Sequence, residues 1–181
     1  MDLQWWSPAQ LVGYVAFVLG VGSFLQTDDR RFKHFMLGEC LAYMLHFGLL
    51  GNPTAVASSA LSALRSWLSL HTRSVWVALG VVAANLGLGL LLAQRPAHWL
   101  PLAASCLGTL ALFLLQGVAM RLVMLCGTGL WIANNLIVGS IGGTALEVVV
   151  ALVNLTTIVR LWRQARAART AAVASSVHTP K

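Results

Sequence analysis

The feature that most constrains this chain is a succession of long apolar stretches, separated by short junctions that carry nearly all of its charge. A helix must supply roughly 20 mostly apolar residues to cross about 30 Å of hydrocarbon, because it rises about 1.5 Å per residue. Seven stretches reach that length, so the predicted fold class is all-α, a polytopic membrane bundle of seven transmembrane helices. The predicted spans are residues 8–26, 34–51, 54–71, 75–94, 98–116, 120–138 and 143–163.

The breaks between these spans have identifiable causes. Residues 28–31, Asp-Asp-Arg-Arg, are too charged to lie in hydrocarbon. Gly-Asn-Pro at 51–53, Gln-Arg-Pro at 94–96 and the glycine-rich segment 139–143 are typical of chain reversals. We therefore predict short connections and antiparallel neighbouring helices.

Composition argues against a soluble domain. Of the 181 residues, 58% are hydrophobic and only 9% are charged, which is too little charge to cover a soluble core. The net charge of +7 could suggest nucleic acid, but the basic residues lie between spans or after the last one, so we predict no nucleic-acid binding. Cys40, Cys106 and Cys126 lie within apolar stretches and lack CxxC spacing. We expect reduced thiols, with no metal site and no cofactor.

The positions of Lys and Arg predict the orientation, because short basic loops are retained in the cytoplasm. With an N-terminus outside and a C-terminus inside, Arg95 is the only basic loop residue on the outer side. Arg65 lies within the third span, near its cytoplasmic end. The basic residues then placed on the cytoplasmic side are Arg30, Arg31, Lys33, Arg73, Arg121, Arg160, Arg163, Arg166, Arg169 and Lys181.

The end of the chain adds two expectations. Beyond the last span an arginine recurs every third residue, at positions 160, 163, 166 and 169. We expect this strip to bind anionic lipid at the cytoplasmic face, at about 1 kcal/mol per charge. Residues 171–181 are small and polar, and we predict a disordered cytoplasmic tail there.

An internal repeat accompanies the spans. Residues 24–31 align with 114–121, and at nearly the same offset Thr54-Ala55 aligns with Thr144-Ala145. The first three helices would then match the last three, with the fourth as a linker. This plan resembles the 3+1+3 arrangement of SWEET and PQ-loop transporters, whose repeats are related by an axis along the membrane normal.

Four segments also carry a family resemblance. They are RRFKHF at 30–35, RSWLSLHTRS at 65–74, GSIGGTALE at 139–147 and NLTTIVRLWRQAR at 154–166. Through them the chain resembles the YgjV-type bacterial inner membrane proteins over almost its whole length, a family grouped with SWEET-like proteins. The resemblance implies a helical fold in the inner membrane of a bacterium, without implying a particular activity. The proline-glutamine pair that names PQ-loop proteins is absent, because Gln26 and Gln116 each follow leucine.

Ionisable groups inside the bilayer need partners, because each costs at least about 2.5–3.5 kcal/mol at a helix centre. Glu39 lies 12 residues before Gly51 and Arg65 lies 14 after it, so both reach similar depths on antiparallel helices. We predict a structural ion pair between Glu39 and Arg65. A gating role for the same pair is the alternative.

Glu147 has no basic residue expected at its depth in the seventh span. The predicted neighbours are amides on the sixth span, with Trp131 about one turn deeper and His46 on the second span. The alternatives are that Glu147 lies near the outer headgroups or is a protonated packing residue, and that His46 is a satisfied interhelical donor. The groups predicted to face one central cavity, for a substrate or a proton, are His46, Trp131, Asn134, Asn135, Glu147 and Asn154.

Two functions follow from these groups. The first is a small-solute transporter or facilitator, which requires a cavity within the membrane lined by these side chains. The second is a membrane subunit without transport activity that binds a protein or lipid partner, which favours a solid core. An enzyme is not expected, since the chain has no HExxH, GxSxG, P-loop or paired-aspartate motif.

Overall fold

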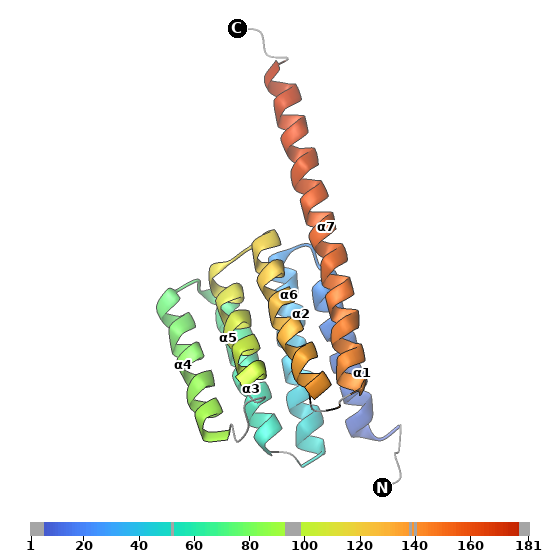
Figure 1. Cartoon of the computed structure of the whole chain (residues 1–181), viewed down its shortest axis with the longest axis vertical. Coiled ribbons are helices and arrows are strands. Elements are labelled where there is room, and N and C mark those ends of the chain that lie inside the picture. Colours follow the sequence, from blue (N-terminus) through green and yellow to red (C-terminus); the bar gives the residue numbers. More distant parts are fainter. Residues whose placement is uncertain (1–5, 52, 93–98, 138, 140, 178–181) are drawn as a thin grey trace.

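The structure is a computed structural model, and it describes residues 6–51, 53–92, 99–137, 139 and 141–177. These residues form seven helices and no strands (Figure 1). The all-α fold class predicted from hydropathy is thereby confirmed. The helices are α1 Pro8–Leu25, α2 Asp29–Leu49, α3 Pro53–His71, α4 Val75–Leu92, α5 Trp99–Leu114, α6 Gly117–Ile137 and α7 Ile141–Val177.

The largest departures from the predicted spans are at the start of α2 and at the end of α7. α2 begins at Asp29, because the Asp28 carboxylate caps it by accepting a hydrogen bond of 2.7 Å from the Arg31 backbone N–H. Charged residues predicted to form a loop therefore form the first helical turn. α7 continues to Val177, through the first part of the segment predicted to be disordered, while residues 178–181 lie outside the described part. The alanine- and arginine-rich sequence after residue 163 favours helix.

The helices form two three-helix units and one additional helix. α1, α2 and α3 pack in sequence, as do α5, α6 and α7, so α2 and α6 are the middle helices of their units. Contacts of α1 with α7 and of α3 with α5 join the units into a ring of six helices. α4 packs against α5 at the edge of the bundle (Figure 1). This arrangement agrees with the predicted 3+1+3 plan.

Several helices are suited to a bilayer. Three are long and apolar enough to cross it: Pro8–Leu25, Gly117–Ile137 and Thr144–Thr170. Val75–Leu91 and Trp99–Leu114 are apolar but shorter. α2 and α3 carry the charged and hydroxyl residues that lower their hydropathy, and they pack beside each other within the ring.

Side chains are distributed as in a protein surrounded by lipid. Large apolar residues face outward: Leu91 is 82% exposed and Leu90 is 69% exposed. Polar residues lie inside, since Ser23, Thr109 and Asn154 are fully buried. Burial of polar groups and exposure of apolar ones is the reverse of the pattern expected in water.

The two ends of the bundle differ. The basic end is the end formed by residues 26–28, 72–74 and 115–116, where α7 projects past the other helices toward the C-terminus (Figure 1). The opposite, N-terminal end holds the start of α1. The apolar core lies toward the basic end, where Phe24 and Phe32 pack edge to face at 5.3 Å. Its other buried members include Leu112, Phe113, Met120 and Met124.

Candidate functional site

A cavity of about 740 Å³ lies inside the bundle, and residues from all seven helices line it. Its volume falls within the range of small-molecule sites, about 300–1,000 Å³. The wall reaches Ala55 and Pro101, each the third residue of its helix at the N-terminal end. Deeper in the bundle it reaches Arg65, about 15 Å further along α3. The polar or ionisable wall residues are Glu39, Tyr43, Ser58, Ser62, Arg65, Asn85, Ser105, Thr128, Asn134 and Glu147.

Three of the predicted site residues line this cavity. Asn134 and Trp131 project from α6, and Glu147 projects from α7. Residues three apart share a helix face, which explains why Trp131 and Asn134 both reach the wall. Their convergence with Glu147 follows from the packing of α6 against α7.

The other three predicted site residues lie elsewhere. His46 places its Nδ1 atom 2.6 Å from the Ala9 carbonyl oxygen on α1, so it is the interhelical partner that we considered as the alternative. Asn135 does not line the cavity, because the next residue of a helix points about 100° away from Asn134. Asn154 is buried near the basic end, where its Nδ2 atom donates a hydrogen bond of 2.9 Å to the Arg121 carbonyl oxygen.

Glu39 and Arg65 both line the cavity but form no ion pair within 4.0 Å. Among the described residues the ion pair within this distance joins Arg121 to Asp29. The Arg65 side chain turns toward α5, where Nη1 lies 3.3 Å from Ser105 Oγ and 3.4 Å from its carbonyl oxygen. The Glu39 carboxyl group lies against α1, where a Cβ atom on Gly20 would lie 2.8 Å from Oε1. Adjacent helices α2 and α3 thus bring the two residues to one cavity without forming an ion pair within 4.0 Å.

Arg65 belongs to a polar chain that crosses three helices. From the guanidinium on α3 the chain passes to Ser105 on α5, whose Oγ donates a hydrogen bond of 3.1 Å to Asn85 Oδ1 on α4. This connects α4 to the wall of the cavity although α4 lies outside the ring. The Nε atom of Arg65 is buried and has no hydrogen-bond partner among the residues that the structure describes.

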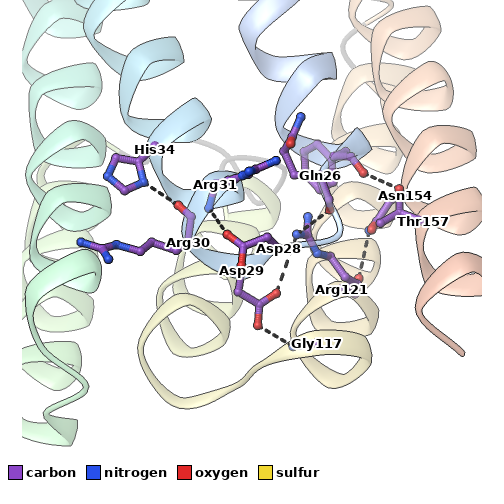
Figure 2. Close-up of polar contacts among 11 residues, drawn as sticks. Gln26, Asp28, Asp29, Arg30, Arg31, His34, Gly117, Arg121, Asn154 and Thr157 are labelled. Atoms are coloured by element: carbon purple, nitrogen blue, oxygen red, sulfur yellow. Dashed lines mark hydrogen bonds and ion pairs between the residues drawn. The ribbon is translucent and has the colours of Figure 1, made fainter. Parts of the chain in front are cut away.

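Toward the basic end, a polar network joins the two three-helix units (Figure 2). Arg121 of α6 is fully buried; its Nη2 donates a hydrogen bond of 3.0 Å to the Gln26 carbonyl oxygen and lies 3.8 Å from Asp29 Oδ1. Its guanidinium lies 3.7 Å from the centroid of the Phe32 ring. The Asp29 Oδ2 atom also accepts a hydrogen bond of 2.7 Å from the Gly117 N–H. We call Gln26, Asp29, Gly117 and Arg121 the basic-end seal.

Two residues of α7 extend the interactions around the seal. Thr157 Oγ1 donates a hydrogen bond of 2.6 Å to the Phe24 carbonyl oxygen, and Asn154 bonds the Arg121 carbonyl oxygen (Figure 2). Phe24 itself lines the cavity. From the sequence, Arg121 is expected on the cytoplasmic side at the start of the predicted span 120–138, and its contacts with Gln26 and Asp29 are not predicted. The repeat alignment placed Gln26 and Arg121 at equivalent junctions, which was the available signal.

Comparison with known proteins places the chain in a family. The profile of the family Imp-YgjV, described as bacterial inner membrane protein, matches residues 7–165. The inner membrane protein YgjV of Escherichia coli (strain K12) is 39% identical over 155 residues, which cover 86% of this chain and 85% of that protein. No solved structure matches the chain. The resemblance seen in the four sequence segments is therefore confirmed, and the apolar helices are consistent with a chain that crosses the membrane several times. The chain belongs to the YgjV family of bacterial inner membrane proteins.

Proposed function

We propose that this protein carries a small polar solute across the inner membrane by alternating access. The observation that carries the proposal is the cavity of about 740 Å³ between two three-helix units, with Glu39, Arg65 and Glu147 in its wall. Charged side chains within a bilayer are costly and mark solute or ion pathways. Transporters built from two repeats bind solute between the repeats, near the middle of the membrane.

The basic-end seal supports alternation. Gln26 and Asp29 belong to the first unit, whereas Gly117 and Arg121 belong to the second. A rocking motion of one unit against the other would break these interactions and open the cavity toward the basic end. The interactions are few and polar, and they can reform after solute release.

The positive-inside rule supports a cytoplasmic location for the basic end. With this orientation the wall of the cavity extends toward the outer surface and the seal faces the cytoplasm. The conformation described here would then be closed on the cytoplasmic side, before solute release into the cell.

Uptake into proteoliposomes tests the proposal. A panel of sugars, amino acids, nucleosides and organic cations is offered to liposomes that contain the full chain. We expect uptake of one class, and loss of this uptake in Glu147→Gln without unfolding. Asn134→Leu and Asn135→Leu form a matched pair, since the first residue lines the cavity and its neighbour does not. Uptake of no solute above protein-free liposomes would overturn the proposal.

The second candidate, a subunit that docks a protein or lipid partner, predicts a solid core. The cavity favours the transporter, because a core that only holds a docking surface gains stability by being filled.

Equal uptake by wild type and Glu147→Gln would remove the Glu147 carboxyl group from the transport mechanism.

A further inference from the structure

The charge content of the cavity wall narrows the class of solute. Among the described residues the wall holds two acidic side chains, Glu39 and Glu147, and one basic side chain, Arg65. All three side chains line the same cavity, and Glu39 lies close enough to both of the others for their charges to act on it. Low dielectric strengthens such interactions relative to water.

Arg65 is incompletely satisfied. It is only 8% exposed, yet Nε has no partner among the described residues and Nη1 reaches Ser105 only at 3.3 and 3.4 Å. These distances are long for hydrogen bonds of a charged donor, which are usually about 2.7–2.9 Å. A planar guanidinium with free N–H groups fits a carboxylate, which accepts two parallel hydrogen bonds.

Glu39 and Glu147 have no basic side chain as an ion-pair partner among the described residues. Neither forms a hydrogen bond or an ion pair with another described residue. When both are ionised they repel each other. One ammonium group placed between them would relieve that repulsion and supply hydrogen-bond donors to both carboxylates.

We propose that the cavity binds a zwitterion that carries an ammonium group and a carboxylate, as an α-amino acid does. Its carboxylate contacts the Arg65 guanidinium, and its ammonium group contacts Glu39 and Glu147. A sugar would leave all three side chains without a charged partner. A simple amine would leave Arg65 unpaired, and a simple carboxylic acid would meet two acidic side chains. The transport of this zwitterion rests on the proposed function, whereas its binding does not.

Binding to the full-length protein in lipid nanodiscs tests the zwitterion directly. A panel of α-amino acids is titrated, and the tightest binder is compared with its decarboxylated amine and its deaminated acid. We expect each analogue to bind about tenfold or more weakly, since each loses at least one charge-assisted hydrogen bond. Arg65→Gln should weaken binding of the amino acid by about the same factor and should not weaken binding of the amine, because it removes a positive charge from the wall.

Three further variants keep the test decisive. Glu147→Gln should weaken the amino acid and the amine, and Asn135→Leu should change neither. Because amine binding reports an intact cavity, it also shows whether Arg65→Gln is folded. Should Arg65→Gln fail to fold, Arg65→Lys replaces it, because lysine keeps the charge and loses the paired donors.

Uptake measured in parallel separates the two proposals. Binding and uptake of an amino acid support both. Binding without uptake of any solute supports the zwitterion site and overturns transport. Uptake of a sugar or a simple cation without amino acid binding overturns the zwitterion and keeps transport. An amine that binds as tightly as its parent amino acid also overturns the assignment of Arg65.

Discussion

Replacement of Arg121 by methionine should open the cavity toward the basic end. Methionine keeps an unbranched apolar side chain but removes the guanidinium that bonds Gln26 and lies near Asp29. Asp29 would keep its hydrogen bond from Gly117 and lose its ion pair with Arg121. If the two units rock as proposed, the guanidinium bridges them only in the conformation described here, so this conformation alone should be destabilised.

The magnitude follows from burial. Removal of one member of a buried ion pair costs about 3–5 kcal/mol. The Arg121 side chain is fully buried, but Asp29 is 23% exposed and the nearest N–O distance is 3.8 Å, which places the cost near the lower limit. A loss of about 3 kcal/mol changes the ratio of closed to open conformers by about 150-fold, at about 1.4 kcal/mol per factor of ten.

The assay follows the reaction of one cysteine in the cavity. The native thiols Cys40, Cys106 and Cys126 are replaced by alanine, and Ser62→Cys supplies a reporter in the wall. A membrane-impermeant maleimide is added from the side of the basic end. Labelling of Ser62→Cys should be slow in the protein that keeps Arg121. It should be about 100-fold faster with Arg121→Met when opening of the basic end is the step that limits the labelling rate.

Arg31→Met is the matched control, because Arg31 is exposed in the neighbouring first turn of α2. It removes the same charge without breaking the seal, and labelling should stay slow. An unchanged labelling rate in a folded Arg121→Met protein would refute the reasoning, since the seal would then not govern access from this side. Combining Arg121→Met with Asp29→Asn should raise the free-energy change of opening by less than the sum of the two single changes.

Three further predictions concern packing, one misplaced site residue and orientation. Gly89→Ala should destabilise the protein by about 1–3 kcal/mol in thermal unfolding, because the new Cβ atom would collide with the Leu102 side chain. Gly87→Ala is the control, since its Cβ atom would meet nothing within 4 Å and the change should be neutral or slightly stabilising. His46→Ala should lower stability by about 0.6 kcal/mol, the mean for a polar contact between membrane helices, and leave uptake unchanged; a loss of uptake at equal stability would place His46 in the pathway. A reporter fused after residue 181 should be cytoplasmic, and an active periplasmic alkaline phosphatase at that position would contradict the orientation.

Much of the secondary structure could be predicted from hydropathy. Each span depends on a local sum over about 20 residues, so α1, α3 and α4 begin at or within one residue of their predicted starts. The positive φ of +67° at Gly51 agrees with the predicted reversal there. α2 begins before its predicted start because Asp28 caps the helix and the charged residues after it form the first turn.

The candidate site could be predicted only in part. Glu147, Asn134 and Trp131 lie in the wall of one cavity, as expected, because depth along antiparallel helices can be counted from the turns. Counting gives depth but not direction around the helix axis. His46 lies at a suitable depth yet points to Ala9, and Asn135 lies beside Asn134 yet misses the wall.

The sequence by itself determined that this chain is a helical membrane protein with seven helices, because hydropathy is a sum over neighbouring residues. Only the tertiary structure decided which polar groups meet. It separated Glu39 from Arg65, turned Arg65 toward Ser105 and made Arg121 part of a seal. The physical reason is that partners across a bundle depend on how each helix is rotated, and that rotation is fixed by packing against helices distant in the chain.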